Sequence, residues 1–266
     1  MGCAILHEGD YVFLTGNQIG ALLLDWTAQK GAASKSNPYM CKTIVTSEFQ
    51  SHIAQSHGLR VIETLTGFKH IAGAIEKDPD NYVFGGEESY GYLPVTWVRD
   101  KDSISASLAL TELANNHSLI EKLTDLQVQH GLYHEELKNL IFGQHELHKM
   151  QDFMGKLKDA ASLIGSTLGA RTIIDVLDLH EGAVAPVTNY CQDLKHSLPP
   201  AAVYQFYLDP EARVTIRPSG TEPKVKIYVS LRYKSKANRE SILKARSELA
   251  EEASLVLQDF LKIVGA

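Results

Sequence analysis

The segment Arg217–Pro223, with the sequence RPSGTEP, gathers groups that can bind an anion. It combines a guanidinium and hydroxyl groups with a glycine that lets backbone N–H groups approach a ligand. Such a set suits a phosphate dianion, because arginine can donate two parallel hydrogen bonds while hydroxyl and amide donors surround the other oxygens. The candidate donors are Arg217, Ser219, Gly220 and Thr221. The alternative is an ordinary hairpin turn in which proline and glycine only reverse the chain.

A second segment, Gly85–Gly91 (GGEESYG), places an acid near a hydroxyl. Side chains alternate along an extended backbone, so Glu87 and Ser89 can point the same way. A carboxylate beside a hydroxyl suits the vicinal hydroxyl groups of a sugar. The alternative is an acidic connection that is only solvated.

Two lysines could act on the same ligand. Lys101 lies in the charged run Arg99–Asp102 and could serve as a general acid or base, with Arg99 beside it. Lys69 lies in the segment Thr66–His70, at the end of a predicted strand, and could reach a ligand held by the acidic segment. The alternatives are the solvated start of a helix and a surface lysine.

The run His145-Glu146-Leu147-His148 resembles a zinc motif but is one residue shorter than HExxH. Its histidines are spaced i and i+3, and no third ligand is evident. The sequence therefore predicts a polar helix face here and no zinc site.

The elements that would position these groups alternate between strand and helix from Cys41 onward. The capping signature of Ser47 with Gln50, and Gly58 after it, predict where the first helix begins and ends. The predicted strands are 42–46, 60–65 and 82–84, and the other helices are 68–76 and 102–115. This order predicts a parallel sheet covered by helices, with ligands at the carboxyl ends of its strands.

The second half has a different pattern. Residues 117–167 are mostly helical in pattern, and four strands follow at 172–174, 202–208, 214–217 and 225–231. In the last helix, apolar residues recur at steps of three and four: Ile242, Ala245, Leu249, Ala253, Val256 and Phe260. The predicted fold class is α/β: a parallel β/α domain followed by an α+β domain with a helix packed on an antiparallel sheet.

The first 36 residues are too short to fold alone. Cys3–Leu6 and Tyr11–Leu14 predict a hairpin, Gln18–Gln29 a helix, and Gly31–Pro38 a linker. We expect the apolar side chains of this segment to be partly uncovered, with self-association as a consequence: Ile5, Leu14, Leu23 and Trp26.

Composition excludes several classes of protein. Asp plus Glu (32) exceed Lys plus Arg (26), and the net charge of −6 argues against nucleic acid and anionic membranes as partners. Three cysteines without a CxxC pair argue against a disulfide scaffold and indicate a reducing cytosol. The sequence has no apolar run of about 20 residues and no secretory signal pattern at its start. A cytoplasmic location is therefore expected.

Taken together, the motifs TGNQIGALL, TGFKHIA, GGEESYGY with RDKD, and RPSGTEPKVKIYV resemble those of the α-D-phosphohexomutases. This family includes phosphoglucomutases and phosphomannomutases, and the order and spacing of the motifs also fit. The segment YHEELKNLIFGQHELHKMQDFMGKL is more weakly similar to the phosphoglucomutase/phosphopentomutase branch. The resemblance covers nearly the whole chain.

The resemblance implies parts of a four-domain enzyme. Residues 1–36 correspond to the end of domain two, 37–142 to the sugar-binding domain three, and 143–266 to the phosphate-binding domain four. The family's phosphoserine loop and its DxDxDR loop, which binds Mg²⁺, have no counterpart in this sequence. We therefore expect a chain that is inactive alone, whereas the intact family uses Mg²⁺ and a sugar bisphosphate activator.

By the same resemblance, each motif residue has an expected role. Glu87 and Ser89 would bind sugar hydroxyls, and Lys101, with Arg99 beside it, would transfer a proton. The non-reacting phosphate would be held by Arg217, Ser219, Gly220 and Thr221, with Lys226 where many relatives have arginine. The site would also be lined by Thr66, Gly67 and Lys69.

The expected function is therefore part of a phosphoglucomutase-like enzyme that interconverts sugar 1-phosphates and 6-phosphates. A phosphorylated sugar and the missing N-terminal half are the expected partners. One alternative is a non-catalytic sugar-phosphate-binding module, or a subunit completed by a separate N-terminal chain. Mannose and pentose phosphates remain open as substrates, and a scaffold whose loops have no function is the third alternative.

Overall fold

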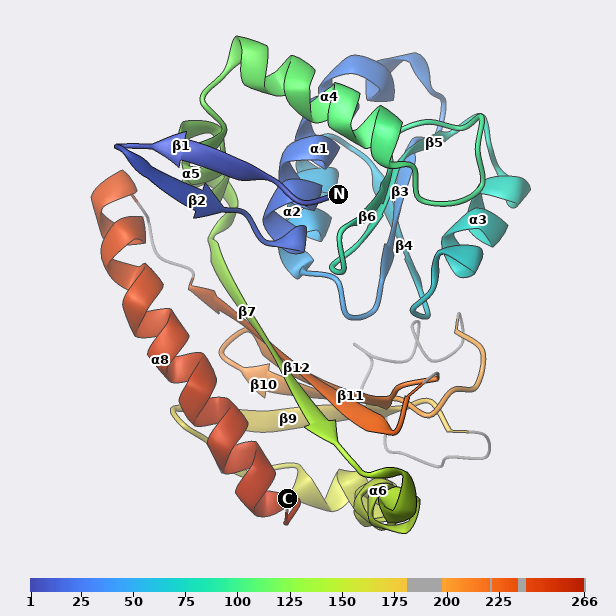
Figure 1. Ribbon diagram of the computed structural model, residues 1–266, viewed down its shortest axis with the longest axis vertical. Helices are drawn as coiled ribbons and strands as arrows, with labels where there is room; N and C mark the ends of the chain where they lie inside the picture. The colour runs from blue at the N-terminus through green and yellow to red at the C-terminus, as the bar shows by residue number, and fades with distance from the viewer. Residues whose placement is uncertain (181–197, 221, 234–237, 266) are drawn as a thin grey trace. The chain divides into compact units, whose positions relative to one another are not determined.

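The computed structural model describes residues 1–180, 198–220, 222–233 and 238–265 (Figure 1). The chain divides into two compact units. The first comprises Met1–Gly131 with Ser235–Ile242, and the second comprises Leu132–Lys234 with Leu243–Ala266.

The first unit is built on a four-stranded sheet with the order β4-β3-β5-β6. β3 (Tyr39–Thr43), β4 (Arg60–Thr64) and β5 (Tyr82–Glu87) are parallel, and β6 (Gly91–Leu93) runs antiparallel to β5. Helices α2 (Glu48–Ser56) and α3 (Phe68–Lys77) connect the parallel strands. The predicted β/α domain is therefore confirmed.

Local capping explains where the helices of this unit begin. The Ser47 side chain accepts a hydrogen bond from the backbone N–H of Phe49, and Asp102 accepts from Ile104 and Ser105 at the start of α4 (Ser103–Asn116). Ser118 caps α5 (Leu119–His130) in the same way. Each cap satisfies a backbone donor that has no partner inside its helix.

The N-terminal segment forms the predicted hairpin and helix. β1 (Ala4–His7) pairs antiparallel with β2 (Asp10–Phe13), and α1 (Gly16–Gly31) is followed by the short 3-10 helix η1 (Ala32–Ser34). α1 packs against α2 and β5. Leu14, just before α1, is only 3% exposed, and Leu23, within α1, is fully buried. The expectation that these two side chains are uncovered was wrong.

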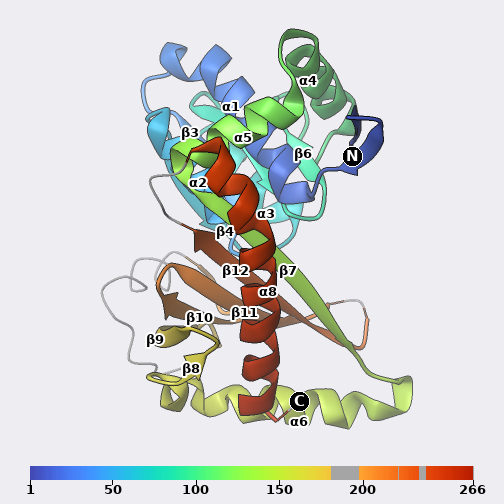
Figure 2. The same ribbon diagram turned by 90° about the vertical axis from the view of Figure 1, so that its left-hand side faces the viewer.

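The second unit contains a six-stranded antiparallel sheet with the order β7-β12-β11-β10-β9-β8. Its strands are β7 (Leu132–Ile141), β8 (Thr167–Leu168), β9 (Arg171–Asp178), β10 (Tyr204–Asp209), β11 (Ala212–Pro218) and β12 (Lys224–Tyr233). Helix α8 (Arg239–Ile263) lies along one face of this sheet (Figure 2). All six periodic residues of α8 are buried, and the rings of Phe206 and Phe260 are 5.1 Å apart. The predicted α+β unit is therefore confirmed.

One predicted element was wrong. Residues 132–141 were expected to be helical, but they form the edge strand β7, which pairs with β12 from Leu132 to Ile141. Glu, Leu and Lys favour helices in isolation, and pairing with a neighbouring strand overrides that preference. The helical segments that follow are η2 (Gln144–Glu146), α6 (Leu147–Lys156) and η3 (Leu157–Leu163).

Candidate functional site

The carboxyl edge of the parallel sheet brings two of the predicted segments together. β4 and β5 both run parallel to β3, so the residues that follow them lie at one edge. The backbone N–H of Gly67 donates to Oε1 of Glu87 at 2.9 Å. Glu87 is only 9% exposed, so this hydrogen bond is shielded from water and fixes one carboxylate oxygen.

Lys101 joins the same edge at Gly91. A Cβ atom added to Gly91 would lie 3.1 Å from Cδ of Lys101 and 3.3 Å from Oε2 of Glu87. The lysine stem and the second carboxylate oxygen therefore approach the same bare Cα. The ammonium of Lys101 lies 3.0 Å from Oδ1 of Asp100 and 5.9 Å from the centre of the Phe68 ring. Its side chain is largely exposed and remains accessible to a ligand.

The other predicted groups of this unit lie around that edge. Lys69 and Ser89 are exposed, and Thr66 is half-buried. Burial lowers the pKa of His70, the charge of Lys69 lowers it further, and Glu87 opposes both effects. The pKa of His70 therefore depends on both charges. The sequence alone did not identify His70 as part of this edge.

Arg99 is engaged elsewhere. Its guanidinium forms an ion pair with Glu76 on α3 and donates to the carbonyl of Thr96. The described contacts of its side chain do not include Lys101. The structure therefore brings Lys101 to Glu87 but gives Arg99 other partners.

Lys42 was missed by the sequence analysis and is fully buried at the same end of the sheet. Its Nζ lies 2.5 Å from Oε1 of Glu63 and 2.8 Å from Oε1 of Glu48, and it donates to the carbonyl of Thr46 at 3.2 Å. A buried ammonium needs such partners, because an unpaired charge in the interior is costly. The cluster ties the connection between β3 and α2 to the neighbouring strand β4.

In the second unit, strand register brings two cations together. Arg217 on β11 lies directly opposite Lys226 on β12. Nη2 of Arg217 donates to the Tyr228 hydroxyl at 3.2 Å, and its Cζ lies 5.8 Å from the centre of that ring. Nε of Arg217 is buried and has no hydrogen-bond partner among the described residues. The guanidinium is therefore anchored at Nη2 by the hydroxyl of Tyr228.

The loop after Arg217 closes tightly. The N–H of Ser219 donates to the carbonyl of Lys224 at 2.8 Å, and Lys224 forms an ion pair with Glu222. A hydrogen bond from Lys224 lowers the pKa of Glu222. Gly220 is exposed, and Thr221 lies outside the described residues. A hairpin turn and an anion-binding loop both fit this geometry, so the binding role stays a prediction.

A buried polar row lies behind Arg217 on the same face of the sheet. The Tyr207 hydroxyl donates to Oε1 of Gln205 at 3.1 Å, and Nε2 of Gln205 donates to Oγ1 of Thr215 at 2.9 Å. Gln205 and Thr215 are register partners, and Thr215 shares a face with Arg217 two residues later. The alternation of polar and apolar residues in β11 could have revealed this row from the sequence.

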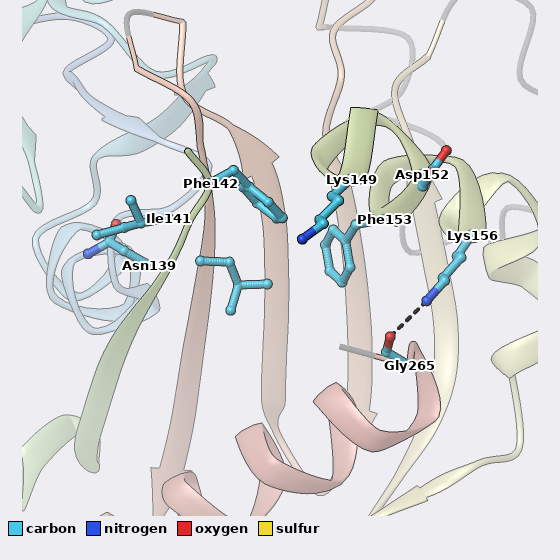
Figure 3. Close-up of a pocket in the computed structure, with 9 residues that line it drawn as sticks. Asn139, Ile141, Phe142, Lys149, Asp152, Phe153, Lys156 and Gly265 are labelled. Atoms are coloured by element: carbon cyan, nitrogen blue, oxygen red, sulfur yellow. Dashed lines mark hydrogen bonds between the residues drawn. The ribbon is translucent and has the colours of Figure 1, made fainter. Parts of the chain in front are cut away.

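The second unit also has a cavity of about 570 Å³ (Figure 3). Leu140, Phe142 and Phe153 line it together with two lysines of α6. Both ammonium groups are engaged, Lys149 with Glu146 at 2.5 Å and Lys156 with the carbonyl of Gly265 at 2.7 Å. None of the predicted site residues that the structure describes lines the cavity, so it has no part in the candidate site.

The His145–His148 run is divided between two elements. His145 lies in η2 and His148 in α6, so the two histidines do not share one continuous α-helix. Within the described ranges, no group of three or more His, Cys, Asp or Glu side chains could hold a metal ion. No helix in that part of the chain is long and apolar enough to cross a membrane.

The sequence was compared with known families and curated proteins. Residues 15–130 match the family model described as phosphoglucomutase/phosphomannomutase, alpha/beta/alpha domain III. A phosphoglucomutase of Staphylococcus epidermidis is 34% identical over 233 residues, which cover 84% of this chain and 41% of the relative. A phosphoglucomutase of Staphylococcus aureus is 32% identical over 236 residues, with coverages of 85% and 41%. The chain thus spans about two fifths of the length of the curated relatives it matches.

Solved structures show the same fold. A phosphoglucomutase from Paramecium, in its open form, superimposes with a TM-score of 0.56 at 19% identity, covering 96% of this chain and 43% of that one. A phosphoglucomutase/phosphomannomutase family protein from Burkholderia thailandensis gives a TM-score of 0.57 at 11% identity, with coverages of 94% and 44%. At these identities the likeness concerns the fold alone.

Proposed function

The chain belongs to the α-D-phosphohexomutase family, and we propose that it is the sugar- and phosphate-binding part of a phosphoglucomutase-like enzyme. In that reaction an enzyme phosphoserine donates its phosphoryl group to a sugar monophosphate. The bisphosphate intermediate that forms then reorients in the site. It returns to the serine the phosphoryl group that the sugar carried at the start, so that sugar 1-phosphate and 6-phosphate interconvert. Catalysis of this kind depends on positioning and charge stabilisation.

The observation that carries the proposal is the meeting of Glu87, Gly67 and Lys101 at the carboxyl edge of the parallel sheet. Oε1 of Glu87 is fixed by Gly67, which leaves Oε2 to accept a hydrogen bond from a sugar hydroxyl. Ser89 adds a second polar contact, and Lys101 moves a proton at the reacting oxygen. Thr66 and Lys69 line the same edge. Arg99 adds a positive charge near Lys101 in sequence, and its guanidinium is held by the ion pair with Glu76 of α3.

The groups of the second unit hold the phosphate that does not react. Arg217 and Lys226 place two positive charges opposite each other on paired strands, which favours a dianion. Ser219, Gly220 and Thr221 supply loop donors. Binding energy from this remote phosphate accelerates the reaction only if the phosphoryl donor is also in place.

The division into the end of domain two (1–36), domain three (37–142) and domain four (143–266) stays a prediction. The domain III match begins at residue 15 and therefore includes α1. On the other side, β7 at 132–141 pairs with the sheet of the second unit.

This chain is proposed to be inactive alone. The sequence contains no DxDxDR loop and no phosphoserine loop of the family type. The described residues contain no group of ligands for the Mg²⁺ that the resemblance implies, so these residues do not fit the metal. The sugar bisphosphate activator and a cytoplasmic location belong to the same proposal.

A subunit completed by a separate N-terminal chain is the second candidate function, and the hairpin supports it. β1 and β2 form a sheet of only two strands, which is marginally stable in water. Its apolar side chains are strongly exposed: Leu6 at 64%, Tyr11 at 68% and Phe13 at 76%. A cavity of about 520 Å³ lies between β1 and the helices α4 and α5. Further strands from a partner chain would cover these side chains.

Calorimetry with glucose 6-phosphate, together with a coupled mutase assay, tests the proposal. We expect one sugar phosphate bound per chain and no turnover. Robust turnover by the 266-residue chain would show that the parts of its longer relatives outside the match are not needed. Absence of binding to glucose, mannose and pentose phosphates would overturn the recognition role.

A further inference from the structure

The segment Thr15–Asn17 at the start of α1 has no role in the function proposed above, yet it contacts the acidic turn that carries Glu87 and Ser89. We propose that Gly16 is a positioning residue that seats this turn, residues 87–90, for sugar binding. The inference rests on the proposed function, because it assigns a role to Gly16 at the same site.

The contact at Gly16 leaves no room for a side chain. An added Cβ would lie 1.8 Å from the carbonyl oxygen of Glu88, 2.7 Å from its carbonyl carbon and 3.1 Å from the N atom of Tyr90. All three are backbone atoms, so they cannot turn aside as the end of a flexible side chain can. Any larger residue at position 16 must therefore displace the turn or the helix.

Hydrogen bonds also hold the turn in its position against Gly16. The hydroxyl of Tyr92, which is almost fully buried, donates to the carbonyl of Gly16 at 2.8 Å. Oγ1 of Thr43 donates to Oε2 of Glu88 at 3.4 Å. The side chain of Asn17 accepts from the N–H of Ser47 at 3.1 Å, which fixes the connection after β3 against α1. The turn thus lies against two elements that are tied to each other.

The backbone of the turn needs such support. Tyr90 has a φ of +67°, a left-handed conformation that non-glycine residues adopt only at a cost. The amino group of Met1 donates to the carbonyl of Tyr90 at 2.7 Å. A strained turn persists where its surroundings determine it, and the seat at Gly16 supplies that constraint directly beside Glu87 and Ser89.

A shift of the turn would move the groups that are proposed to bind the sugar. Cβ atoms in proteins do not approach other atoms within 3.0 Å, so alanine at position 16 displaces the Glu88 carbonyl by about 1 Å or more. Both sugar-binding side chains flank Glu88 in sequence and move with it. Misplacement on this scale is enough to lose well-aligned hydrogen bonds.

Two glycines of the same helix provide matched controls. At Gly31, the last residue of α1, an added Cβ meets nothing within 4 Å. At Gly20 it meets the amide end of the Gln50 side chain at 2.5 Å, a group that can rotate away. Gly31→Ala thus controls for the change of residue type, and Gly20→Ala for crowding of α1 away from the turn.

The experiment measures calorimetric binding of glucose 6-phosphate, hydrogen exchange of residues 85–92 and thermal unfolding. We expect Gly16→Ala to unfold cooperatively, to bind about tenfold more weakly or worse, and to exchange faster in 85–92. Gly31→Ala should match the wild type in all three measurements, and Gly20→Ala should leave exchange in 85–92 unchanged. A folded Gly16→Ala protein with wild-type binding and exchange would overturn the inference.

The exchange measurement separates this inference from the proposed function. If the wild-type chain binds no sugar phosphate, the proposed function fails. The role of Gly16 in positioning the turn is still tested, because unchanged hydrogen exchange of residues 85–92 in Gly16→Ala would refute it. If Gly16→Ala does not fold, Tyr92→Phe decides, since it removes one hydrogen bond without adding volume. Faster exchange of 85–92 in Tyr92→Phe is the expected result, and unchanged exchange would refute the seat.

Discussion

The two units of this chain assemble their candidate binding groups in different ways. In the first unit, Gly67, Glu87 and Lys101 are far apart in sequence; Gly67 and Glu87 meet because parallel strands end at one edge, and the side chain of Lys101 reaches them at Gly91. In the second, Arg217 and Lys226 lie nine positions apart and meet because a tight hairpin pairs them. One arrangement depends on the packing of many elements, the other on the register of two strands.

This difference predicts different sensitivity to mutation. A site made by topology is disturbed by changes in the buried contacts that hold its elements, even when these do not touch a ligand. A site made by register tolerates distant changes and responds mainly to loss of its own side chains. Both tryptophans, Trp26 and Trp97, lie in the first unit, so tryptophan fluorescence reports the unfolding of that unit separately.

The largest expected effect is on stability, at Lys42. Lys42→Ala leaves Glu48 and Glu63 without their buried cation, and breaking such a cluster costs about 3–5 kcal/mol. Urea denaturation followed by tryptophan fluorescence measures the loss. Arg239→Ala in the same unit is the control, because its ion pair with Asp125 is exposed to solvent and contributes little to stability. Equal losses in the two variants would contradict the contrast between buried and exposed cations.

The next effect is on ligand binding, at Arg217. Loss of charge-assisted hydrogen bonds to a phosphate should weaken binding of glucose 6-phosphate by about 10- to 100-fold in Arg217→Ala. Lys226→Ala should weaken it less, because an ammonium offers a point charge and no planar fork. Neither change should alter the fluorescence unfolding curve of the first unit. Arg239→Ala, which removes an exposed partner of Asp125, is the matched control for binding. Wild-type affinity in Arg217→Ala would refute the phosphate role.

A smaller binding effect is expected at Glu87. Glu87→Gln keeps an oxygen that can accept from Gly67 but removes the negative charge that strengthens a hydrogen bond to a sugar hydroxyl. We expect affinity for glucose 6-phosphate to fall about five- to tenfold, while affinity for inorganic phosphate stays unchanged. Glu121→Gln removes an exposed carboxylate of α5 in the same unit and should change neither affinity. An equal loss for both ligands would mean that Glu87 does not act through the sugar.

Most of the first unit could be predicted from the sequence because its signals are local. Apolar strands, the capping signature at Ser47 and the glycine at Gly58 each identify an element or its end without knowledge of its neighbours. Strand–helix–strand repeats then predict a parallel sheet, and the shared edge of Gly67 and Glu87 follows because parallel strands have their carboxyl ends at one edge.

The failures have a common physical origin in non-local contacts. β7 was predicted as helix because its pairing partner lies about ninety residues away in sequence. Leu23 was expected to be exposed because the packing of α1 against β5 is not encoded in α1 alone. Lys42 was overlooked because a lysine inside a strand is normally a surface residue, and only the fold brings Glu48 and Glu63 to it.

The smallest expected effect tests how buried charges join the elements of the first unit. Asp25 on α1 lies 2.8 Å from His57 after α2 and 2.7 Å from Lys122 on α5. Burial alone would raise the pKa of Asp25, but hydrogen bonds from these two side chains outweigh it and hold the pKa below its ordinary value of 3.8. Because the pKa is lowered in the folded state, the ionised carboxylate stabilises the fold at pH values above 3.8. This stabilisation is lost as the pH falls through the folded-state pKa.

Asp25→Asn should therefore lower the free energy of unfolding by about 1 kcal/mol at neutral pH. It should also flatten the acid limb, which is the fall in the free energy of unfolding as the pH is lowered, measured by tryptophan fluorescence. Asp125→Asn, which removes an exposed carboxylate of the same unit, should keep the wild-type acid limb. If Asp25→Asn also showed the wild-type pH dependence, the carboxylate would not couple α1 to α2 and α5. Apolar packing alone would then have to hold the elements that position Glu87 and Lys101.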